Sequence, residues 1–438
     1  MRLARRTLRP LLAAALASAL VVSVTPASPA AATSVTIDKR LFGVHDSSLG
    51  SLGNGVVGSL RLWDTGTTWR EIETSPNVYD FSRLDKIVTA AQAKNVEVTL
   101  VLGMTPDFHS PGGARAMPPD ISTFTRYVQA VVSRYRSWNG RRGIAAYQVW
   151  NEANVTNFWT GTPLQMAQLT KATWNAVKSI DKGALVVSPA FAARINEQIR
   201  GITRFAFARV DGIPAWKFVD VMSLNLYPLD KYGSTLGTPE KSMELLAKAR
   251  RLLGFGGLPA SKPIWNTEVN YGMRTGAYGG TRASAISAER QAAYVIRTYL
   301  LNASRGVKRV FWYSYDMGTL ASGGTLGNTL LTSPADRATP TLAGKSVGLV
   351  RGWLLSGKLI GASKSALPCA KDGKGTYTCV IKYSGGVKRV YWNPTKKATV
   401  IAAKGASYKV GGSGVRARVK SRAKVVVDYR PVMVRSRF

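Results

Sequence analysis

The sequence is poor in the residues on which disulfide scaffolds and most metal sites depend. Two of its 438 residues are cysteine and two are histidine, so we expect neither a disulfide-rich fold nor a metal site built from cysteine and histidine. Acidic residues are also scarce, because 24 Asp and Glu stand against 60 Lys and Arg, a net charge of +36. Such a charge favours anionic surroundings but carries no information about the fold.

Beyond the N-terminus the chain also lacks a run of apolar residues long enough to span a membrane. The first 32 residues combine four arginines, an apolar run over Leu11–Val24 and an Ala-x-Ala sequence at Ala30–Ala32. These are the three parts of a secretory signal peptide, and the run is shorter than the roughly 20 residues that cross a bilayer. We therefore expect cleavage near Ala32 and a secreted protein, extracellular or associated with the cell wall. An N-terminal membrane anchor is the alternative.

Eight short apolar runs recur between residues 33 and 359, separated by amphipathic stretches typical of helices. The runs are Leu41–Val44, Ser59–Trp63, Val96–Gly103, Ile144–Trp150, Ala184–Ser188, Val219–Leu226, Pro263–Thr267 and Val310–Tyr315. Alternating strands and helices predict a parallel sheet, and eight such units predict an α/β fold, the (β/α)8 TIM barrel. An open doubly wound sheet is the alternative, which the absence of a G-x-G-x-x-G after the first strand disfavours.

Residues 360–438 differ in composition, with short β-rich runs between turns that predict a small all-β sandwich domain. Eighteen Lys and Arg against two acidic residues give this domain a charge of +16. Cys369 and Cys379 flank a turn and can form a disulfide if their Cα atoms are suitably spaced. The charge indicates a solvated surface or retention on anionic cell-envelope polymers. Nucleic acid is the least favoured partner, because no nucleic-acid fold signature is present.

Two glutamates follow predicted barrel strands at the point where each strand ends. The fourth strand ends in Trp150-Asn151-Glu152 and the seventh in Trp265-Asn266-Thr267-Glu268. Catalytic residues of such barrels lie at the carboxyl ends of the strands, so we expect both carboxylates at one rim. Two facing carboxylates are what glycoside hydrolysis requires, and about 5–5.5 Å between them is the retaining geometry. A structural ion pair with an arginine is the alternative for either glutamate alone.

With these motifs the chain resembles the clan A glycoside hydrolases, which are retaining enzymes built on a (β/α)8 barrel. It is most similar to family 39, which contains β-xylosidases and an iduronidase, since Val78–Phe81 and Phe311–Asp316 also resemble that family's segments. The sequence departs from many relatives in two places. Ala153 stands where they have proline, and Asn225 where they usually have histidine.

The resemblance implies a role for each matching residue. Glu152 matches the general acid/base and Glu268 the nucleophile, while Asn151 matches the residue that contacts the sugar 2-hydroxyl. Tyr227 matches a hydroxyl that bonds the nucleophile, and Arg61 matches a buried cation near it. The remaining candidates for contact with the sugar are Trp312 and Trp159 as platforms, Asn225, His45 and His109. Aromatic and histidine side chains at such positions also serve packing, which is the alternative for each.

We therefore predict a secreted retaining glycoside hydrolase that cleaves O-glycosidic bonds of a poly- or oligosaccharide by double displacement. It should need no metal and no cofactor. The alternative is a non-catalytic carbohydrate- or cell-envelope-binding protein on a glycosidase-like barrel, which retains the carboxylates without the reaction.

Overall fold

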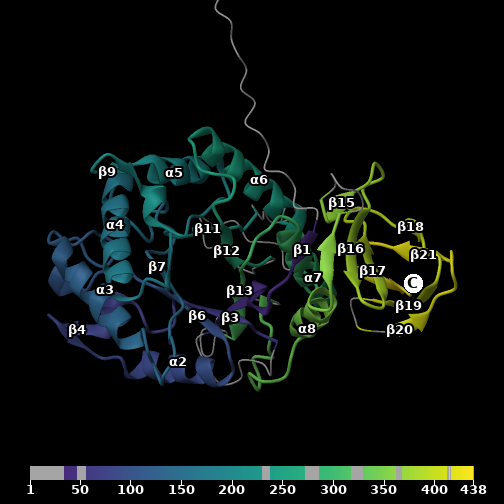
Figure 1. The fold of residues 1–438 in the computed structure, drawn as a ribbon, viewed down its shortest axis with the longest axis horizontal. Coiled ribbons are helices and arrows are strands. Elements are labelled where there is room, and N and C mark those ends of the chain that lie inside the picture. The colour runs from purple at the N-terminus through teal and green to yellow at the C-terminus, as the bar shows by residue number, and fades with distance from the viewer. Residues whose placement is uncertain are drawn as a thin grey trace, which may run out of the picture.

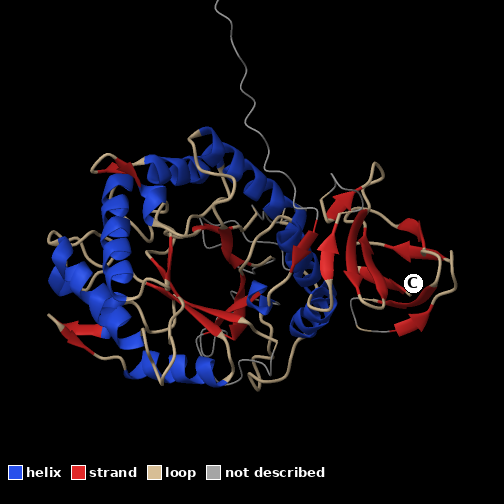
Figure 2. Cartoon of the chain, in the orientation of Figure 1, coloured by secondary structure: helices blue, strands red, loops and turns tan. Residues whose placement is uncertain are grey.

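The computed structural model shows a ring of strands enclosed by helices, with a second group of strands beside it (Figures 1 and 2). It describes residues 34–46, 56–228, 237–271, 286–316, 329–361, 367–411, 414 and 416–437. The expected signal peptide lies outside these residues. Among the helices that are described, none is long and apolar enough to cross a membrane.

Eight parallel strands form the ring. They run in the order β11-β12-β13-β2-β3-β6-β7-β8, and a parallel bridge between Val187 and Val221 joins the two ends of that order. The strands are β2 (Phe42–Asp46), β3 (Ser59–Leu62), β6 (Glu97–Val101), β7 (Ala146–Gln148), β8 (Leu185–Val187), β11 (Met222–Asn225), β12 (Ile264–Val269) and β13 (Val310–Asp316). Each predicted apolar run overlaps one of them, which confirms the predicted barrel.

Helices cover the outside of the ring in Figure 2. They are α1 (Trp69–Ile72), α2 (Ser82–Ala93), α3 (Ile121–Tyr135), α4 (Pro163–Ile180), α5 (Asn196–Phe207), α6 (Pro239–Phe255), α7 (Ala288–Ser304) and α8 (Leu342–Leu354). In α3, Val128, Val131, Val132 and Tyr135 recur every three or four residues and are all buried, so one face of the helix packs on the barrel. Two small hairpins lie between these elements, β4 (Glu73–Ser75) with β5 (Val78–Tyr79) and β9 (Arg209–Val210) with β10 (Ile213–Pro214).

Alternate residues of each barrel strand point into the ring. Ala146, Val187, Val221, Trp265 and Phe311 form one buried cluster contributed by five different strands, which is the packed interior of the barrel. The residues between them on each strand belong to the larger cluster under the helices. This period of two decides which side chains face the central axis, except in β12, where an irregular register between Asn266 and Val269 interrupts it before Glu268.

The C-terminal domain consists of two antiparallel sheets packed face to face, as predicted. The larger has the order β1-β14-β16-β17-β22-β19-β20, with β15 paired to β16, and the smaller is β18-β21. Tyr391, Val425, Val427 and Val434 pack between the sheets. The strands are β1 (Ser34–Thr36), β14 (Lys358–Ile360), β15 (Cys369–Lys371), β16 (Tyr377–Tyr383), β17 (Gly386–Trp392), β18 (Ala398–Ile401), β19 (Ala406–Val410), β20 (Arg416–Arg418), β21 (Lys424–Val427) and β22 (Val432–Ser436).

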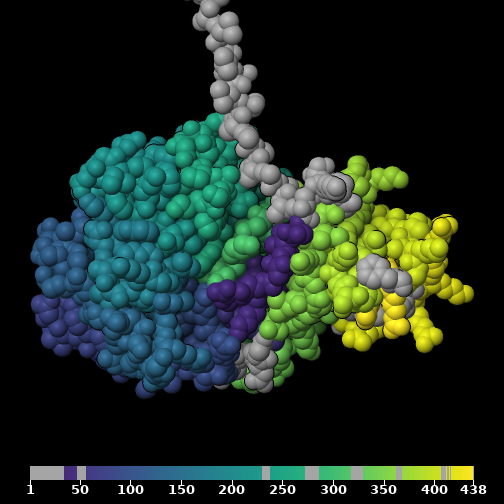
Figure 3. Space-filling view, viewed as in Figure 1, coloured from purple at the N-terminus to yellow at the C-terminus, as the bar shows by residue number. Residues whose placement is uncertain are grey.

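The N-terminal strand joins this sheet although it precedes the barrel in sequence. β1 pairs antiparallel with β14, so Ser34–Thr36, which fall in the range predicted for the barrel, lie in the C-terminal sheet. The first described segment, purple in Figure 3, runs along the junction between the two domains. The domains are therefore tied together at both ends of the barrel sequence.

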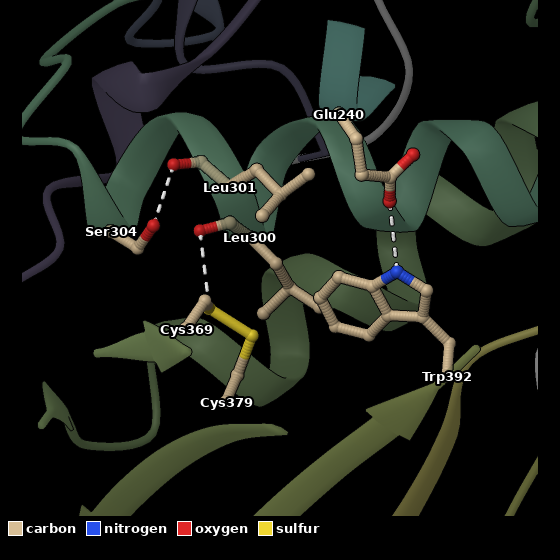
Figure 4. Close-up of a disulfide and its surroundings, with 7 residues drawn as sticks. All are labelled: Glu240, Leu300, Leu301, Ser304, Cys369, Cys379 and Trp392. Carbon is tan, nitrogen blue, oxygen red and sulfur yellow. Dashed lines mark hydrogen bonds between the residues drawn. A yellow bond between two sulfur atoms is a disulfide. The ribbon is translucent and has the colours of Figure 1, made fainter. Parts of the chain in front are cut away.

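Side chains from both domains meet at this junction, shown in Figure 4. Cys369 and Cys379 form a disulfide between β15 and β16, with Cα atoms 4.1 Å apart. The Cys369 sulfur lies 3.6 Å from the carbonyl oxygen of Leu300 in α7. The indole Nε1 of Trp392 donates to Glu240 Oε1 at 2.9 Å, linking β17 to α6. The sandwich is thus packed on the barrel rather than tethered to it.

Candidate active site

The carboxyl ends of the barrel strands carry a polar cluster centred on the buried side chain of Arg61 in β3. Its Nε donates to Gln148 Oε1 at 2.6 Å and its Nη2 to Asn151 Oδ1 at 2.8 Å. Its Nη1 lies 2.8 Å from His45 Nε2 and donates to Glu268 Oε2 at 3.1 Å. Burial lowers the pKa of Arg61, and the neighbouring carboxylates act against that shift. The guanidinium of Arg61 on β3 therefore connects side chains at the ends of β2, β7 and β12.

Glu268 in β12 receives hydrogen bonds on both carboxyl oxygens. The Tyr227 hydroxyl donates to Oε1 at 2.7 Å, and Asn225 Nδ2 lies 3.5 Å from Oε2, beside the bond from Arg61. Burial and the nearby Glu268 carboxylate raise the pKa of Tyr227 well above its usual value, so the phenol keeps the proton that it donates. Hydrogen-bond donors therefore face both carboxyl oxygens of Glu268.

Glu152 follows β7 and reaches the same amide. Asn225 Nδ2 donates to Glu152 Oε1 at 3.1 Å and lies 3.5 Å from Glu268 Oε2, so these two carboxyl oxygens are at most 6.6 Å apart, the sum of the two lengths. The backbone φ of Glu152 is 39°, in the left-handed region that side chains other than glycine rarely adopt. Local strain of this kind is concentrated at functional sites.

His45, Asp64 and Tyr313 extend the cluster along one wall. Because Arg61 can only donate, His45 Nε2 must accept, and the imidazole proton is on Nδ1, which lies 3.6 Å from Asp64 Oδ1. The Tyr313 hydroxyl donates to Asp64 Oδ2, and its ring meets the edge of His45 with centroids 5.1 Å apart. Burial alone would raise the pKa of Asp64, but the contacts with His45 and Tyr313 lower it below the usual value.

The structure thus brings together seven of the ten residues that the sequence singled out for catalysis or substrate binding. They are Arg61, His45, Asn151, Glu152, Asn225, Tyr227 and Glu268. Further members were not foreseen. One is Arg194, whose guanidinium lies 4.5 Å from the centre of the Tyr227 ring. Others are Asp64, Gln148 and Tyr313. Asp64 lies two residues beyond the end of β3, and Gln148 and Tyr313 lie two residues after the inward-facing Ala146 and Phe311, so strand parity could have found them.

The two tryptophans predicted as sugar platforms do not have that role, because neither has an accessible ring face. Trp312 is fully buried, and its Nε1 donates to the carbonyl of Thr329 at 2.7 Å. It belongs to the cluster under the helices, whereas its neighbour Phe311 points into the ring. Trp159 is 3% exposed and packs edge-on against Trp150, with ring centroids 5.0 Å apart. The half-buried Tyr313 faces the cluster instead of Trp312.

His109 was also predicted to contact the sugar, and the structure places it in a different cluster. Its Nε2 lies 2.9 Å from Glu73 Oε1, and its ring stacks on Trp69 with centroids 5.5 Å apart. Glu73 also accepts a hydrogen bond from the Trp69 indole. These contacts give His109 a packing role, which was the alternative for this residue.

Within the described ranges, no group of three or more His, Cys, Asp or Glu side chains is arranged to hold a metal ion.

Comparison with known proteins adds a partial relative. No protein-family model matches the chain. A β-xylosidase from Geobacillus stearothermophilus is 28% identical over 162 residues, which are 34% of this chain and 32% of that protein. The match therefore spans about a third of the relative's length.

Solved structures match over most of the chain. A family 39 glycoside hydrolase from Bacteroides cellulosilyticus WH2 has a TM-score of 0.66 at 16% identity, covering 92% of this chain and 82% of that one. A glucosidase from Croceicoccus marinus has a TM-score of 0.64 at 12% identity, with 92% and 97% covered. A family 30 endoxylanase from Clostridium papyrosolvens C71 has a TM-score of 0.58 at 14% identity, with 92% and 98% covered. The predicted resemblance to clan A glycoside hydrolases is confirmed for the fold.

Proposed function

We propose that this protein is a retaining O-glycosyl hydrolase in which Glu268 is the nucleophile and Glu152 the general acid/base. The observation that carries the proposal is the contact of one amide, that of Asn225, with both carboxylates at the carboxyl rim of the barrel. Their oxygens are at most 6.6 Å apart, which suits the retaining spacing of about 5–5.5 Å better than the wider inverting one. The likeness to glycoside hydrolase folds and the partial β-xylosidase match support the same reaction.

The reaction proceeds in two displacements. Glu268 attacks the anomeric carbon while Glu152 gives its proton to the departing glycosidic oxygen, which leaves a glycosyl ester on Glu268. Glu152, now a carboxylate, then takes a proton from water, and the oxygen of that water attacks the anomeric carbon. The ester bond breaks, the sugar leaves with its original anomeric configuration, and both glutamates return to their starting states.

The surrounding side chains orient these two groups. Arg61 and Tyr227 each hold one oxygen of Glu268, which fixes the direction of its attack. Asn151 accepts from Arg61 through Oδ1, so its Nδ2 is the group placed to donate to the sugar 2-hydroxyl. Such a bond strengthens as the transition state forms.

The proposed substrate is a poly- or oligosaccharide. The similar proteins are described as a β-xylosidase, an endoxylanase and a glucosidase, so aryl xylosides, aryl glucosides and xylan are the first substrates to test.

The test compares the wild type with Glu268→Gln on these substrates and on a panel of envelope polysaccharides. We expect the wild type to release sugar and the variant to lose at least about 10⁴-fold in kcat, because the nucleophile is gone. Glu244→Gln is the matched control, since that carboxylate is 63% exposed on α6 and pairs with Lys241. Equal release by wild type and Glu268→Gln contradicts the assignment of Glu268 as nucleophile. No release by either contradicts the proposed reaction and leaves the non-catalytic carbohydrate-binding alternative.

We further propose that the protein is exported after cleavage near Ala32 and held on anionic envelope polymers by its basic sandwich. Exposed cations surround the β18–β21 sheet, among them Lys396, Lys397, Lys404 and Lys424. Clustered cations bind phosphate polymers in a salt-dependent manner. The N-terminal sequence of the exported protein should begin at residue 33.

Charge reversal tests retention without cutting the chain, because the sandwich shares β1 and the α7 contact with the barrel. We expect the triple substitution of Lys396, Lys397 and Lys424 to glutamate to release the protein from teichoic-acid-bearing walls at lower salt. The same change at Lys182, Lys217 and Lys345 on the barrel surface is the control. Equal elution of both variants and the wild type contradicts retention through the sandwich.

A further inference from the structure

We infer that Asp64 selects the sugar at the proposed catalytic centre by accepting hydroxyl groups of a neutral sugar and excluding an acidic one. The inference rests on the proposed function, because it concerns the sugar unit that Glu268 attacks. Nothing in the reaction itself requires a third carboxylate, so its presence in the cluster calls for a separate role.

Asp64 stands on the same wall as the nucleophile, one imidazole ring away. His45 Nδ1 lies 3.6 Å from Asp64 Oδ1, and His45 Nε2 lies 3.9 Å from Glu268 Oε2. A sugar whose anomeric carbon faces Glu268 can therefore extend along His45 and present the hydroxyls of its far side to Asp64. The Asp64 side chain is 28% exposed, whereas that of His45 is 1% exposed, so the carboxylate is the group that remains accessible.

The neighbours of Asp64 keep it oriented. Tyr313 donates to Oδ2 and packs its ring against His45, so the carboxylate, the imidazole and the phenol brace one another. An ionised carboxylate accepts hydrogen bonds at about four lone-pair positions, so the contacts with His45, Tyr313 and the backbone N–H of Asp64 still leave an acceptor position for a sugar hydroxyl. Hydrogen bonds to a charged acceptor are about twice as strong as neutral ones, which suits a residue that discriminates among sugars.

The same charge disfavours a uronic acid. A sugar carboxylate placed beside Asp64 would meet a like charge, and the local cation is already engaged, because four N–H groups of Arg61 point at protein acceptors. Arg194 lies elsewhere in the cluster, with its guanidinium 4.5 Å from the centre of the Tyr227 ring. Tyr227 contacts Glu268 Oε1, whereas His45, which lies between Glu268 and Asp64, is near Oε2. Arg194 and Asp64 are therefore near opposite oxygens of the Glu268 carboxylate.

The experiment measures kcat/KM for wild type, Asp64→Asn and Tyr313→Phe. The substrates are aryl glucoside, xyloside and glucuronide, and the monodeoxy analogues of whichever neutral glycoside is cleaved. We expect wild type to favour the neutral sugars over the glucuronide. Asp64→Asn should lower kcat/KM on the neutral sugar about tenfold to hundredfold, by loss of a charged hydrogen bond. Asp64→Asn should also reduce the ratio of kcat/KM for the neutral glycoside to kcat/KM for the glucuronide. Tyr313→Phe should lower both kcat/KM on the neutral sugar and this ratio, by smaller factors.

The deoxy analogues separate a contact from a structural effect. When the substrate lacks the hydroxyl that Asp64 accepts, Asp64→Asn should cause no further loss, as a double-mutant cycle requires. Asp107→Asn is the matched control, because that carboxylate is 70% exposed on the loop after β6 and pairs with Arg70. Asp107→Asn should leave the ratios of kcat/KM between the neutral, acidic and deoxy substrates unchanged.

If the wild type is active and Glu268→Gln is inactive, the proposed function stands, and either of two results then overturns the role inferred for Asp64. One is an equal loss for Asp64→Asn on the parent glycoside and on all of its deoxy analogues. The other is a wild-type preference for the glucuronide. If the wild type hydrolyses no glycoside at all, it is the proposed function that fails.

Discussion

The two ends of the barrel each bury an arginine, and the carboxylates around these arginines differ. At the carboxyl end, Arg61 is surrounded by the cluster that contains Glu152, Glu268 and Asp64. At the amino end, Arg309 at the start of β13 donates twice to Glu97 Oε1, at 2.9 and 2.8 Å.

The balance of charge distinguishes the two sites. Glu97 is shared by Arg309 and Arg40, and Arg40 also binds Asp38, so carboxylates and guanidinium groups are equal in number at the amino end. At the carboxyl end, three carboxylates lie in a cluster with two guanidinium groups, the buried Arg61 and the half-buried Arg194. Removing one partner of a balanced buried pair leaves an uncompensated charge, so we expect the amino-end pair to matter for stability, whereas a cluster of carboxylates at the end of a barrel is a candidate functional site.

The amino end of the barrel also contains a cavity. A cavity of about 410 Å³ lies at the amino end, between β1 and the starts of the barrel strands, lined by Val35, Leu41, Val221, Trp265 and Arg309 among others. It contains none of the residues of the polar cluster. The candidate site is therefore defined by the charged groups at the carboxyl end and not by this cavity.

At the carboxyl end we expect a large effect on the rate, second to that of Glu268→Gln. Glu152→Gln should lower kcat by about 10²–10⁴-fold, the usual contribution of a positioned acid–base group, with little change in stability. Azide should restore part of the rate on a substrate with a good leaving group, since an anion needs no general base. An unchanged kcat for Glu152→Gln, measured with aryl glycosides, would contradict the assignment.

The corresponding change at the amino end should affect stability and leave the rate alone. Glu97→Gln removes the charge shared by Arg309 and Arg40, and we expect a loss of about 3 kcal/mol in the free energy of unfolding. Urea unfolding measures that loss, and kcat/KM should not change at a temperature where the variant is folded. A large fall in kcat/KM would erase the distinction between the two ends.

Removing the disulfide at the junction between barrel and sandwich should also lower the free energy of unfolding. Replacing Cys369 and Cys379 by serine removes a link that closes a loop of ten residues, which predicts a loss of about 2–3 kcal/mol. The comparison is urea unfolding of this variant against oxidised wild type. Equal stability of the two proteins would show that packing of β15 on α7 suffices to hold the junction.

The smallest expected effect concerns pH at the amino end. Hydrogen bonds from Arg40 lower the pKa of Asp38 from 3.8 to about 2. A lowered folded-state pKa stabilises the protein above the unfolded value, and this contribution is lost as the pH falls from about 4 towards 2. Because the Asp38 side chain is 45% exposed, its contribution should be below about 1 kcal/mol. Asp38→Asn should unfold with a shallower dependence on pH over that range, and an unchanged slope would rule this contribution out.

Strand order and the main site residues could be predicted from sequence because they depend on local signals. Buried parallel strands are apolar on both faces, so the eight runs stand out between amphipathic helices. Glu152 and Glu268 end two such runs, where a carboxylate does not help the core, and the resemblance to known motifs added Arg61 and Tyr227.

The remaining details depend on which way each side chain faces. Trp312 and Tyr313 are adjacent, and a shift of one residue in strand parity exchanges the core position for the cluster position. β1 pairs with β14, although the two strands are more than 300 residues apart in sequence. Each strand has three residues, which is too short for its sequence to predict the strand with which it pairs. His109 follows β6 in sequence, but its contacts with Glu73 and Trp69 hold it outside the cluster, and the sequence does not show those contacts.

The central claim is that Glu268 forms a covalent bond to the sugar. A 2-deoxy-2-fluoro aryl glycoside of the sugar that is cleaved should trap this ester, since the fluorine slows its hydrolysis. Mass spectrometry of the digested protein should then show one adduct, on the peptide that contains Glu268, and none in Glu268→Gln. An active enzyme that forms no adduct and releases sugar of inverted anomeric configuration would contradict the account.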